Sequence, residues 1–231
     1  SWNIEYGPTG FTQGSGTIEY GVTNPYTIQN LNTSTGYDFY VQSDCGSETS
    51  YWTNVRSFMT SQIPFNVPGI IDFEDALENA NWTLANGSQS NKWYIDTAAN
   101  NTVGGSYALY ISNSNGTAND YNVSSTSNVW AYRDIYFTPI TGEYEIKFDW
   151  RDYGESGYDY LRVYIGDIST VTAGSITPPS GVTQIGGDLN LQSNWATDSL
   201  RLSAAYSGTI KRVYFLWHND SSDGAAPSGG I

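Results

Sequence analysis

Short runs of alternating apolar and polar residues recur along the chain, with turn-forming residues between them. The segments 37–41, 107–111 and 144–150 each place apolar side chains at every second position. A period of two is that of a β-strand with one buried face. Helical spacing is confined to the short segment 74–81 (EDALENAN). The pattern therefore predicts an all-β protein built as a β-sandwich or jelly roll.

The segment 61–69 (SQIPFNVPG) interrupts this pattern. Its two prolines fix φ and lack an N–H donor, so the segment favours a linker over a central strand. It separates residues 1–60, few for a β-sandwich domain, from residues 70–231, which suit one larger sandwich. We therefore expect two domains joined by a linker.

Residues 1–60 resemble the C-terminal part of a fibronectin type III domain. The stretch LNTSTGYDFYV (31–41) carries the resemblance, with Thr33 where that family has a proline. It implies that Tyr37 is the tyrosine-corner residue, whose hydroxyl ties the preceding loop to the backbone. It also implies that 2–7 is the third strand and 51–58 the last, so that the chain begins inside a domain.

From Ile71 onward the chain resembles the cleaved-adhesin family, the MAM-like jelly-roll modules of gingipain and haemagglutinin proteins in Bacteroidetes. The matching motifs are DFE (72–74), KWYI (92–95), GSYALY (105–110), VWAYRD (129–134), FDWRDYGESGYDYLRVYIGD (148–167) and RVYFLWHND (212–220). The resemblance implies a jelly-roll domain over 70–231. Its last strand would begin near 229–231, so we expect that strand to be missing. It further implies a type IX secretion substrate with a non-catalytic role in cell adhesion.

Composition narrows the classes of partner. The net charge is −14, with 9 Lys and Arg against 23 Asp and Glu. This balance argues against nucleic acid or an anionic membrane surface. Cys45 is the only cysteine, so no internal disulfide forms, and no apolar run approaches the roughly 20 residues that span a bilayer. The many Gly, Tyr, Asn and Thr residues are typical of exported bacterial β-proteins, so we expect an extracellular or cell-surface location.

The sequence predicts no enzymatic activity. His218 is the only histidine and Cys45 lies in a segment without one, so no nucleophile has an obvious base. A glycosidase pair needs two carboxylates about 5–10 Å apart on rigid elements. The glycine-rich loop 153–157 is a poor support for such geometry.

The acidic stretch 148–167 predicts a hairpin in which Asp149 pairs with Arg162, leaving Asp152 and Glu155 on an exposed tip. The alternative is that its two strands enter opposite sheets, as consecutive jelly-roll strands often do.

Calcium is the metal that an acidic, loop-rich chain favours, because its ligands are carboxylate and carbonyl oxygens. The family resemblance places a structural calcium ion at Glu74 and Asp75. A solvated acidic helix start at these two residues is the alternative. Zinc is disfavoured, because the chain has one histidine and one cysteine.

Aromatic residues in or near polar loops could stack on sugars. These candidates are Trp130, Tyr132, Tyr153, Tyr158 and Trp195. With Glu155 at the acidic tip, we predict ligand binding by Trp130, Tyr132, Tyr153 and Glu155. The resemblance also implies O-glycosylation at Thr97 (Asp-Thr-Ala) and Ser199 (Asp-Ser-Leu).

Together these features favour a non-catalytic adhesion or accessory binding module of a larger exported bacterial protein. Its partners would be a host or cell-surface protein or glycan, or other modules of the same polypeptide. The alternative is a carbohydrate-binding module attached to a secreted glycosidase or peptidase.

Overall fold

The computed structural model describes all residues from 1 to 231, and nearly all of its regular structure is β-strand. The all-β prediction is confirmed, with fourteen strands, one short helix α1 (Ala76–Asn79) and a 3₁₀ turn η1 (Ala204–Tyr206). No helix is long and apolar enough to cross a membrane. The chain divides into two compact units, 1–62 and 63–231, which are described separately.

The first unit is a single antiparallel sheet of order β2-β1-β3-β4. Its strands are β1 (Trp2–Pro8), β2 (Thr17–Val22), β3 (Gly36–Ser43) and β4 (Arg56–Met59). The hydroxyl of Tyr37 accepts a hydrogen bond from the backbone N–H of Asn32 at 3.1 Å. The Tyr37 ring stacks on Phe58, with ring centroids 5.8 Å apart. Tyr37 thus makes the loop-to-backbone contact expected of a tyrosine corner.

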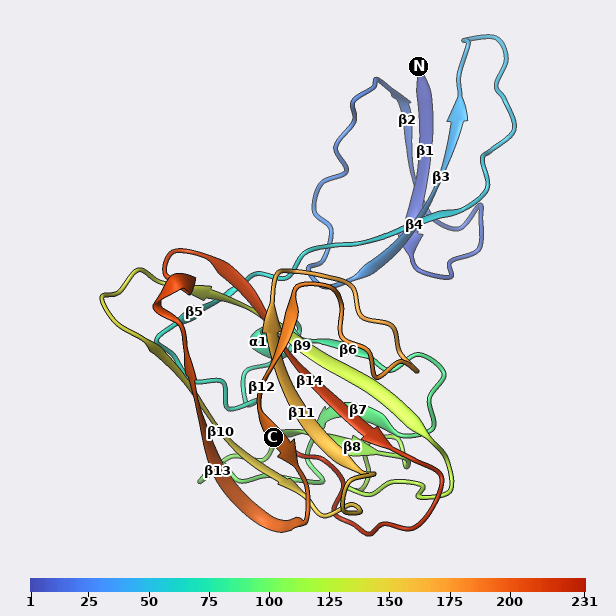
Figure 1. Cartoon of the computed structure of the whole chain (residues 1–231). Helices are drawn as coiled ribbons and strands as arrows, with labels where there is room; N and C mark the ends of the chain where they lie inside the picture. Colours follow the sequence, from blue (N-terminus) through green and yellow to red (C-terminus); the bar gives the residue numbers. More distant parts are fainter. The chain divides into compact units, whose positions relative to one another are not determined.

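The second unit contains two layers of strands, a six-stranded sheet and a layer of two separate strand pairs, which we call the first and the second sheet (Figure 1). The first sheet has the order β12-β11-β14-β9-β5, and β6 also pairs with β9. Its strands are β5 (Phe65–Val67), β6 (Thr83–Ala85), β9 (Ser127–Phe137), β11 (Tyr160–Gly166), β12 (Val182–Leu189) and β14 (Ile210–Asn219). Strand β5 falls inside the predicted linker, so that assignment is wrong for Phe65–Val67. The flanking prolines are compatible with this strand because β5 lies at the sheet edge.

The second sheet consists of two strand pairs joined by the C-terminal residues. The pairs are β7 (Lys92–Asp96) with β8 (Ala108–Ser112), and β10 (Tyr144–Asp152) with β13 (Gln192–Leu202). Gly230 forms antiparallel bridges to both Tyr110 and Arg151. The C-terminus accordingly lies between the two pairs in Figure 1.

The predicted hairpin between β10 and β11 does not form, because the two strands belong to different sheets. Asp149 lies opposite Thr197 on β13. Arg162 instead forms an ion pair with Asp188, with N and O atoms 2.6 Å apart. Both strands still turn an apolar face to the same core, but they do so from opposite sides. Alternation within each strand could not distinguish these two arrangements.

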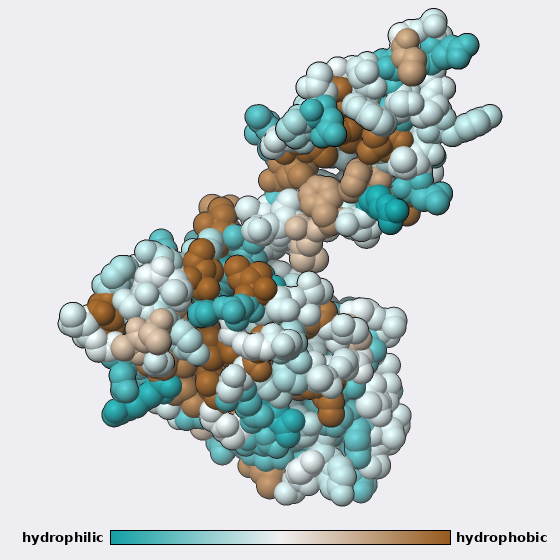
Figure 2. Space-filling view, turned by 45° about the horizontal axis from the view of Figure 1, so that its top comes forward, coloured by the Kyte–Doolittle hydropathy of each residue, from teal (hydrophilic) through white to brown (hydrophobic).

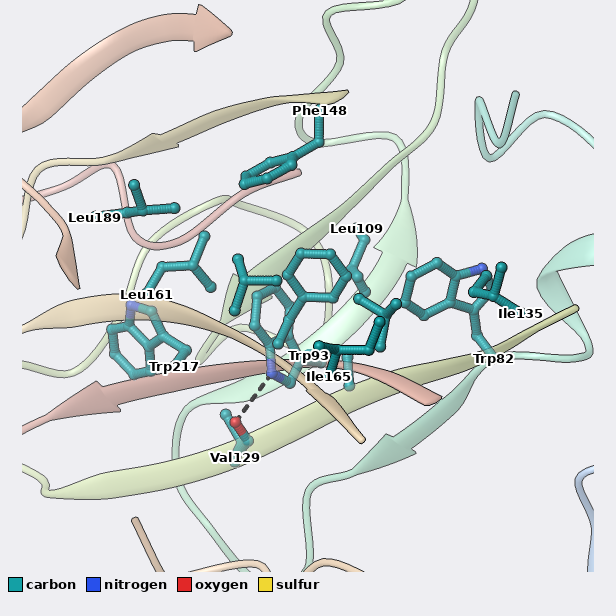
Figure 3. Close-up of a cluster of buried hydrophobic side chains, with 14 of the residues drawn as sticks. Trp82, Trp93, Leu109, Val129, Ile135, Phe148, Leu161, Ile165, Leu189 and Trp217 are labelled. Carbon is teal, nitrogen blue, oxygen red and sulfur yellow. Dashed lines mark hydrogen bonds between the residues drawn. The ribbon is translucent and has the colours of Figure 1, made fainter. Parts of the chain in front are cut away.

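The core between the two sheets is rich in tryptophan (Figure 3). Trp93 from the second sheet and Trp217 from the first are both fully buried. The indole nitrogen of Trp93 donates to the carbonyl of Val129 at 3.1 Å, across the two sheets. This contact satisfies the polar atom of a side chain that otherwise packs as a hydrophobe.

Two buried ion pairs involve strand β9. Arg212 on β14 donates to both carboxylate oxygens of Asp134 at 2.5 and 3.0 Å. Arg133, on the opposite face of β9, makes a similar two-point contact with Glu78 of α1, at 2.6 and 2.9 Å. Asp134 and Arg133 are 1% and 2% exposed, so each charge depends on its partner for solvation.

Candidate functional site

The two sheets of the second unit differ in what covers their outer faces. On the first sheet, Trp130, Tyr132 and Tyr214 form a second apolar cluster with Val171 from the β11–β12 connection. The indole of Trp130 is fully buried and donates to the carbonyl of Ser175 at 2.9 Å. Trp130 and Tyr132 are therefore core residues, and their prediction as ligand contacts is wrong. The prediction failed because β9 carries apolar side chains on both faces, and a loop packs over its outer face.

The outer face of the second sheet carries polar side chains around one half-buried aromatic ring. Trp195 on β13 packs beside Tyr94 and the buried Tyr110. The guanidinium carbon of Arg151 lies 4.8 Å from the centroid of the Trp195 ring, a cation–π distance. A Cβ atom added at Gly230 would lie 3.3 Å from the indole, so the C-terminal backbone supports the ring closely. Trp195 is thus held in one orientation.

Hydrogen bonds fix the polar groups around this ring. The Nε of Arg151 donates to the side-chain oxygen of Asn119 at 2.8 Å. Asp149 accepts from the Thr197 hydroxyl at 2.5 Å and from the Asn101 amide at 2.7 Å. Burial lowers the pKa of Arg151 from its ordinary value, but the guanidinium keeps its charge.

We call these residues the outer-face site: Asn101, Asn119, Asp149, Arg151, Trp195 and Thr197. Asp149 and Arg151 occupy the polar positions that alternate with Phe148 and Trp150, so strand periodicity does place them on one solvent-facing surface. Nothing in the sequence shows that β13, Asn101 and Asn119 meet them there. A flat ring beside oriented carboxylate, amide and guanidinium groups suits a ligand with apolar faces and many hydroxyls.

The loop between β10 and β11 holds the other predicted ligand residues. Tyr153 is 41% exposed and Tyr158 is 56% exposed, so both rings are accessible. Glu155 is partly buried, and its Oε2 atom has no hydrogen-bond partner. Burial, with Asp220 and Asp223 nearby, raises the pKa of Glu155.

Asp152 is fully buried at the end of β10. The prediction that it lies on an exposed tip is therefore wrong. Neither of its carboxylate oxygens has a hydrogen-bond partner. Burial raises the pKa of Asp152 well above its ordinary value, although the Trp217 indole beside it acts in the opposite direction. Nearby, the hydroxyl of Tyr121 donates to Asp159 at 2.5 Å. Burial raises the pKa of Asp159 to about 6 despite this hydrogen bond.

These raised pKa values predict a protein that is more stable in mild acid. Folding favours the protonated form of Asp159, so its contribution is complete below the ordinary pKa of about 3.9 and is lost as the pH rises through about 6. The contribution is about 3 kcal/mol. We expect Asp152→Asn to raise the melting temperature at about pH 8 and to flatten the pH dependence. Glu143→Gln, which removes one exposed charge, is the control. An unchanged pH profile in Asp152→Asn would contradict the assignment.

The predicted calcium ligands are engaged by backbone amides. Asp75 caps α1 by accepting from the N–H of Leu77 at 2.8 Å. Glu74 accepts from the N–H groups of Ser106 and Tyr107 at 2.7 and 2.8 Å. No group of three Asp, Glu, His or Cys side chains comes together closely enough to hold a metal ion. The geometry fits the alternative, an acidic helix start, better than a calcium cage, and calcium binding stays a prediction.

The two predicted glycosylation positions are exposed. Thr97 follows β7, and its hydroxyl is 3.3 Å from the carboxylate of Asp96. Ser199 lies on β13, and its hydroxyl donates to Glu145. Their modification stays a prediction.

No protein-family model matches the chain, and no curated protein matches it. One similar solved structure comes from a study of the promiscuous specificity of carbohydrate-binding modules of the β-sandwich superfamily. It is 13% identical, covers 97% of this chain and 81% of its own, and has a TM-score of 0.41. Another is the module TmCBM61 bound to β-1,4-galactotriose, 10% identical over 64% of this chain and 81% of its own, with a TM-score of 0.34. At these scores neither likeness carries an argument about this chain's ligand.

Proposed function

We propose that this chain is a non-catalytic binding module of a larger exported protein, and that its second unit binds a glycan. The observation that carries the proposal is the outer-face site. Trp195 offers a fixed aromatic surface there, and Arg151 and Asp149 are oriented by Asn119 and Thr197.

Sugars match this arrangement chemically. One face of a pyranose ring is lined with C–H groups, which pack against an aromatic ring, while its hydroxyls both donate and accept hydrogen bonds. Asp149 is an acceptor, Arg151 is a donor and Asn119 can be both. Because these groups are held before the ligand arrives, binding loses little side-chain entropy.

The test is a glycan array followed by calorimetry with the best ligand. We expect Trp195→Ala to weaken binding by about tenfold or more, equal to about 1.4 kcal/mol, with the unit still folded. Tyr158→Ala is the matched control, because its ring is exposed but lies in the β10–β11 loop. If both variants lost glycan affinity equally, or if only Tyr158→Ala lost it, the glycan would bind elsewhere than at the outer-face site. No glycan bound on the array would overturn the proposal.

The parent protein decides whether glycan binding serves adhesion or targets a hydrolase. Adhesion at the cell surface is the reading we favour, because the motifs of 71–220 resemble those of surface adhesin modules. Attachment to a secreted glycosidase or peptidase is the alternative. A melting temperature lowered by EDTA would support the predicted structural calcium ion.

A further inference from the structure

Asp152 differs from the other buried acids of the larger unit, because neither of its oxygens has a hydrogen-bond partner. The face of this unit shown in Figure 2 carries hydrophilic (teal) residues over much of its area, and water solvates carboxylates in such places. Asp152 is 0% exposed and has no such hydration. The Trp217 indole lies beside it, but the nitrogen of this indole is also unpartnered. A buried carboxylate is costly unless a donor or a cation compensates for its lost hydration.

Two loops bring further carboxylates to the end of β10 where Asp152 lies. The β10–β11 connection carries Glu155 and Asp159, and the segment after β14 carries Asp220. The N–H of Asp220 donates to Asp159 at 3.2 Å, which joins the two loops. The charge of Asp159 acts on Asp152, and that of Asp220 acts on Glu155. We call these four residues the acidic cluster.

No basic side chain balances the charge of the acidic cluster. None of its four residues takes part in an ion pair. Arg151 is next in the chain, but its guanidinium is turned to the outer face, where it donates to Asn119. The Oε2 atom of Glu155 is buried and unpartnered, like both oxygens of Asp152. The cluster therefore offers free carboxylate oxygens to a cation.

Asp159 is fixed in position within the acidic cluster. It is 1% exposed, and each of its oxygens accepts one hydrogen bond. Oδ2 accepts from the Tyr121 hydroxyl at 2.5 Å, and Oδ1 accepts from the N–H of Asp220. Each oxygen still has a free lone pair for a metal ion. The loop backbone comes equally close, because a Cβ atom added at Gly224 would lie 2.4 Å from Oδ2.

We propose that Asp152, Glu155 and Asp159 bind a calcium ion at this end of the core. The side-chain donors are all oxygens, which suits calcium and not zinc. Loop carbonyls and water supply the remainder of the about six to eight oxygens that calcium takes. Without the ion the three carboxylates repel one another, and they do not stand close enough to hold a metal together. Glu155 closes the site by rotating inward from its loop.

This site is separate from the calcium site predicted at Glu74 and Asp75, whose carboxylates already accept backbone N–H groups. It does not rest on glycan binding either, because Trp195 is not one of its residues. Its ligands come from the end of β10 and from the following loop, and only the folded chain brings them together. The ion should therefore bind the folded state and raise its stability.

The test is thermal unfolding of the intact chain in calcium chloride. Sodium chloride of equal ionic strength controls for screening of the net charge. We expect a calcium Kd below about 1 mM. The melting temperature should rise by about 5 °C at a calcium concentration of about 100 times Kd. Magnesium, which requires a nearly ideal octahedron, should bind at least about tenfold more weakly. No rise beyond that in sodium chloride would overturn the proposal.

Variants that remove one charge each assign the response to residues. Asp152→Asn should abolish the calcium-induced shift, and it should still fold because it removes an unpaired buried charge. Glu155→Gln should weaken calcium binding by at least about tenfold. Asp223→Asn removes an exposed charge from the same region and should leave the Kd within about twofold. Equal weakening by Asp223→Asn would indicate diffuse attraction to negative charge and would overturn the proposal.

Glu74→Gln distinguishes the two candidate calcium sites, and we expect it to keep the calcium-induced shift. A shift that is lost in Glu74→Gln and kept in Asp152→Asn would locate the ion beside α1 and overturn the proposal. Trp195→Ala should keep the shift, so a failed glycan array has no bearing on this test. The pH profile of Asp152→Asn is measured in EDTA, so that the ion does not mask the titration of Asp152.

Discussion

Asp134→Ala is expected to destabilise the larger unit by about 3–5 kcal/mol, because it leaves the guanidinium of Arg212 buried without its partner. Arg212 is 7% exposed, and it donates two hydrogen bonds to Asp134, at 2.5 and 3.0 Å. Burial lowers the pKa of Arg212 and Asp134 more than offsets this effect. Without Asp134 the side chain still stays charged, because a guanidinium is not deprotonated in proteins. The fall in melting temperature should be on the order of 10 °C. Thermal unfolding followed by near-ultraviolet circular dichroism measures it.

Two further variants test whether the loss of stability comes from leaving a buried charge unpaired or from losing an ion pair of any kind. Glu143→Ala removes an ion pair of 3.7 Å between exposed groups and should change stability by less than about 0.5 kcal/mol. Replacing both partners, Asp134→Leu with Arg212→Met, should be less destabilising than Asp134→Ala, since no buried charge is left alone. If Asp134→Ala behaved like Glu143→Ala, water would be reaching Arg212 and the assignment would be wrong.

Periodicity in the sequence was enough to predict several strands, among them β3, β8 and β10, and which of their side chains share a face. The alternation of Tyr144, Ile146 and Phe148 matches one side of β10, and that of Val213, Phe215 and Trp217 matches the core side of β14. Periodicity carries no information about which strands pair. In the structure Asp149 therefore lies opposite Thr197 and not opposite Arg162. The loop that was expected to close a hairpin connects strands of two different sheets.

Besides strand pairing, the local sequence could not predict which polar residues are buried. Asp152 lies in a stretch of acids and glycines that is typical of a solvated loop, yet it is fully enclosed. Its burial depends on the segment 225–230, whose backbone pairs with Arg151, Tyr153 and Gly154. Such pairing joins segments far apart along the chain, and the local sequence around Asp152 does not reveal it.

Trp130→Ala is expected to cost about 3–5 kcal/mol of stability, because it empties the centre of the cluster on the outer face of the first sheet. The ring of Trp130 lies 5.5 Å from that of Tyr164 and 6.3 Å from that of Tyr214, measured between centroids. Its indole also donates to Ser175, which ties the β11–β12 connection to the sheet. The variant therefore loses both apolar contacts and a loop anchor.

The comparison with Trp195→Ala makes this result informative about function. Both changes remove one tryptophan, but Trp195 is half-buried at the outer-face site and should affect stability less. We expect Trp130→Ala to lower the melting temperature without changing the glycan affinity of the folded fraction, and Trp195→Ala to do the reverse. Trp130→Phe keeps most of the volume and serves if the alanine variant does not fold. Loss of glycan binding in a folded Trp130→Phe variant would contradict the assignment of Trp130 as a purely structural core residue.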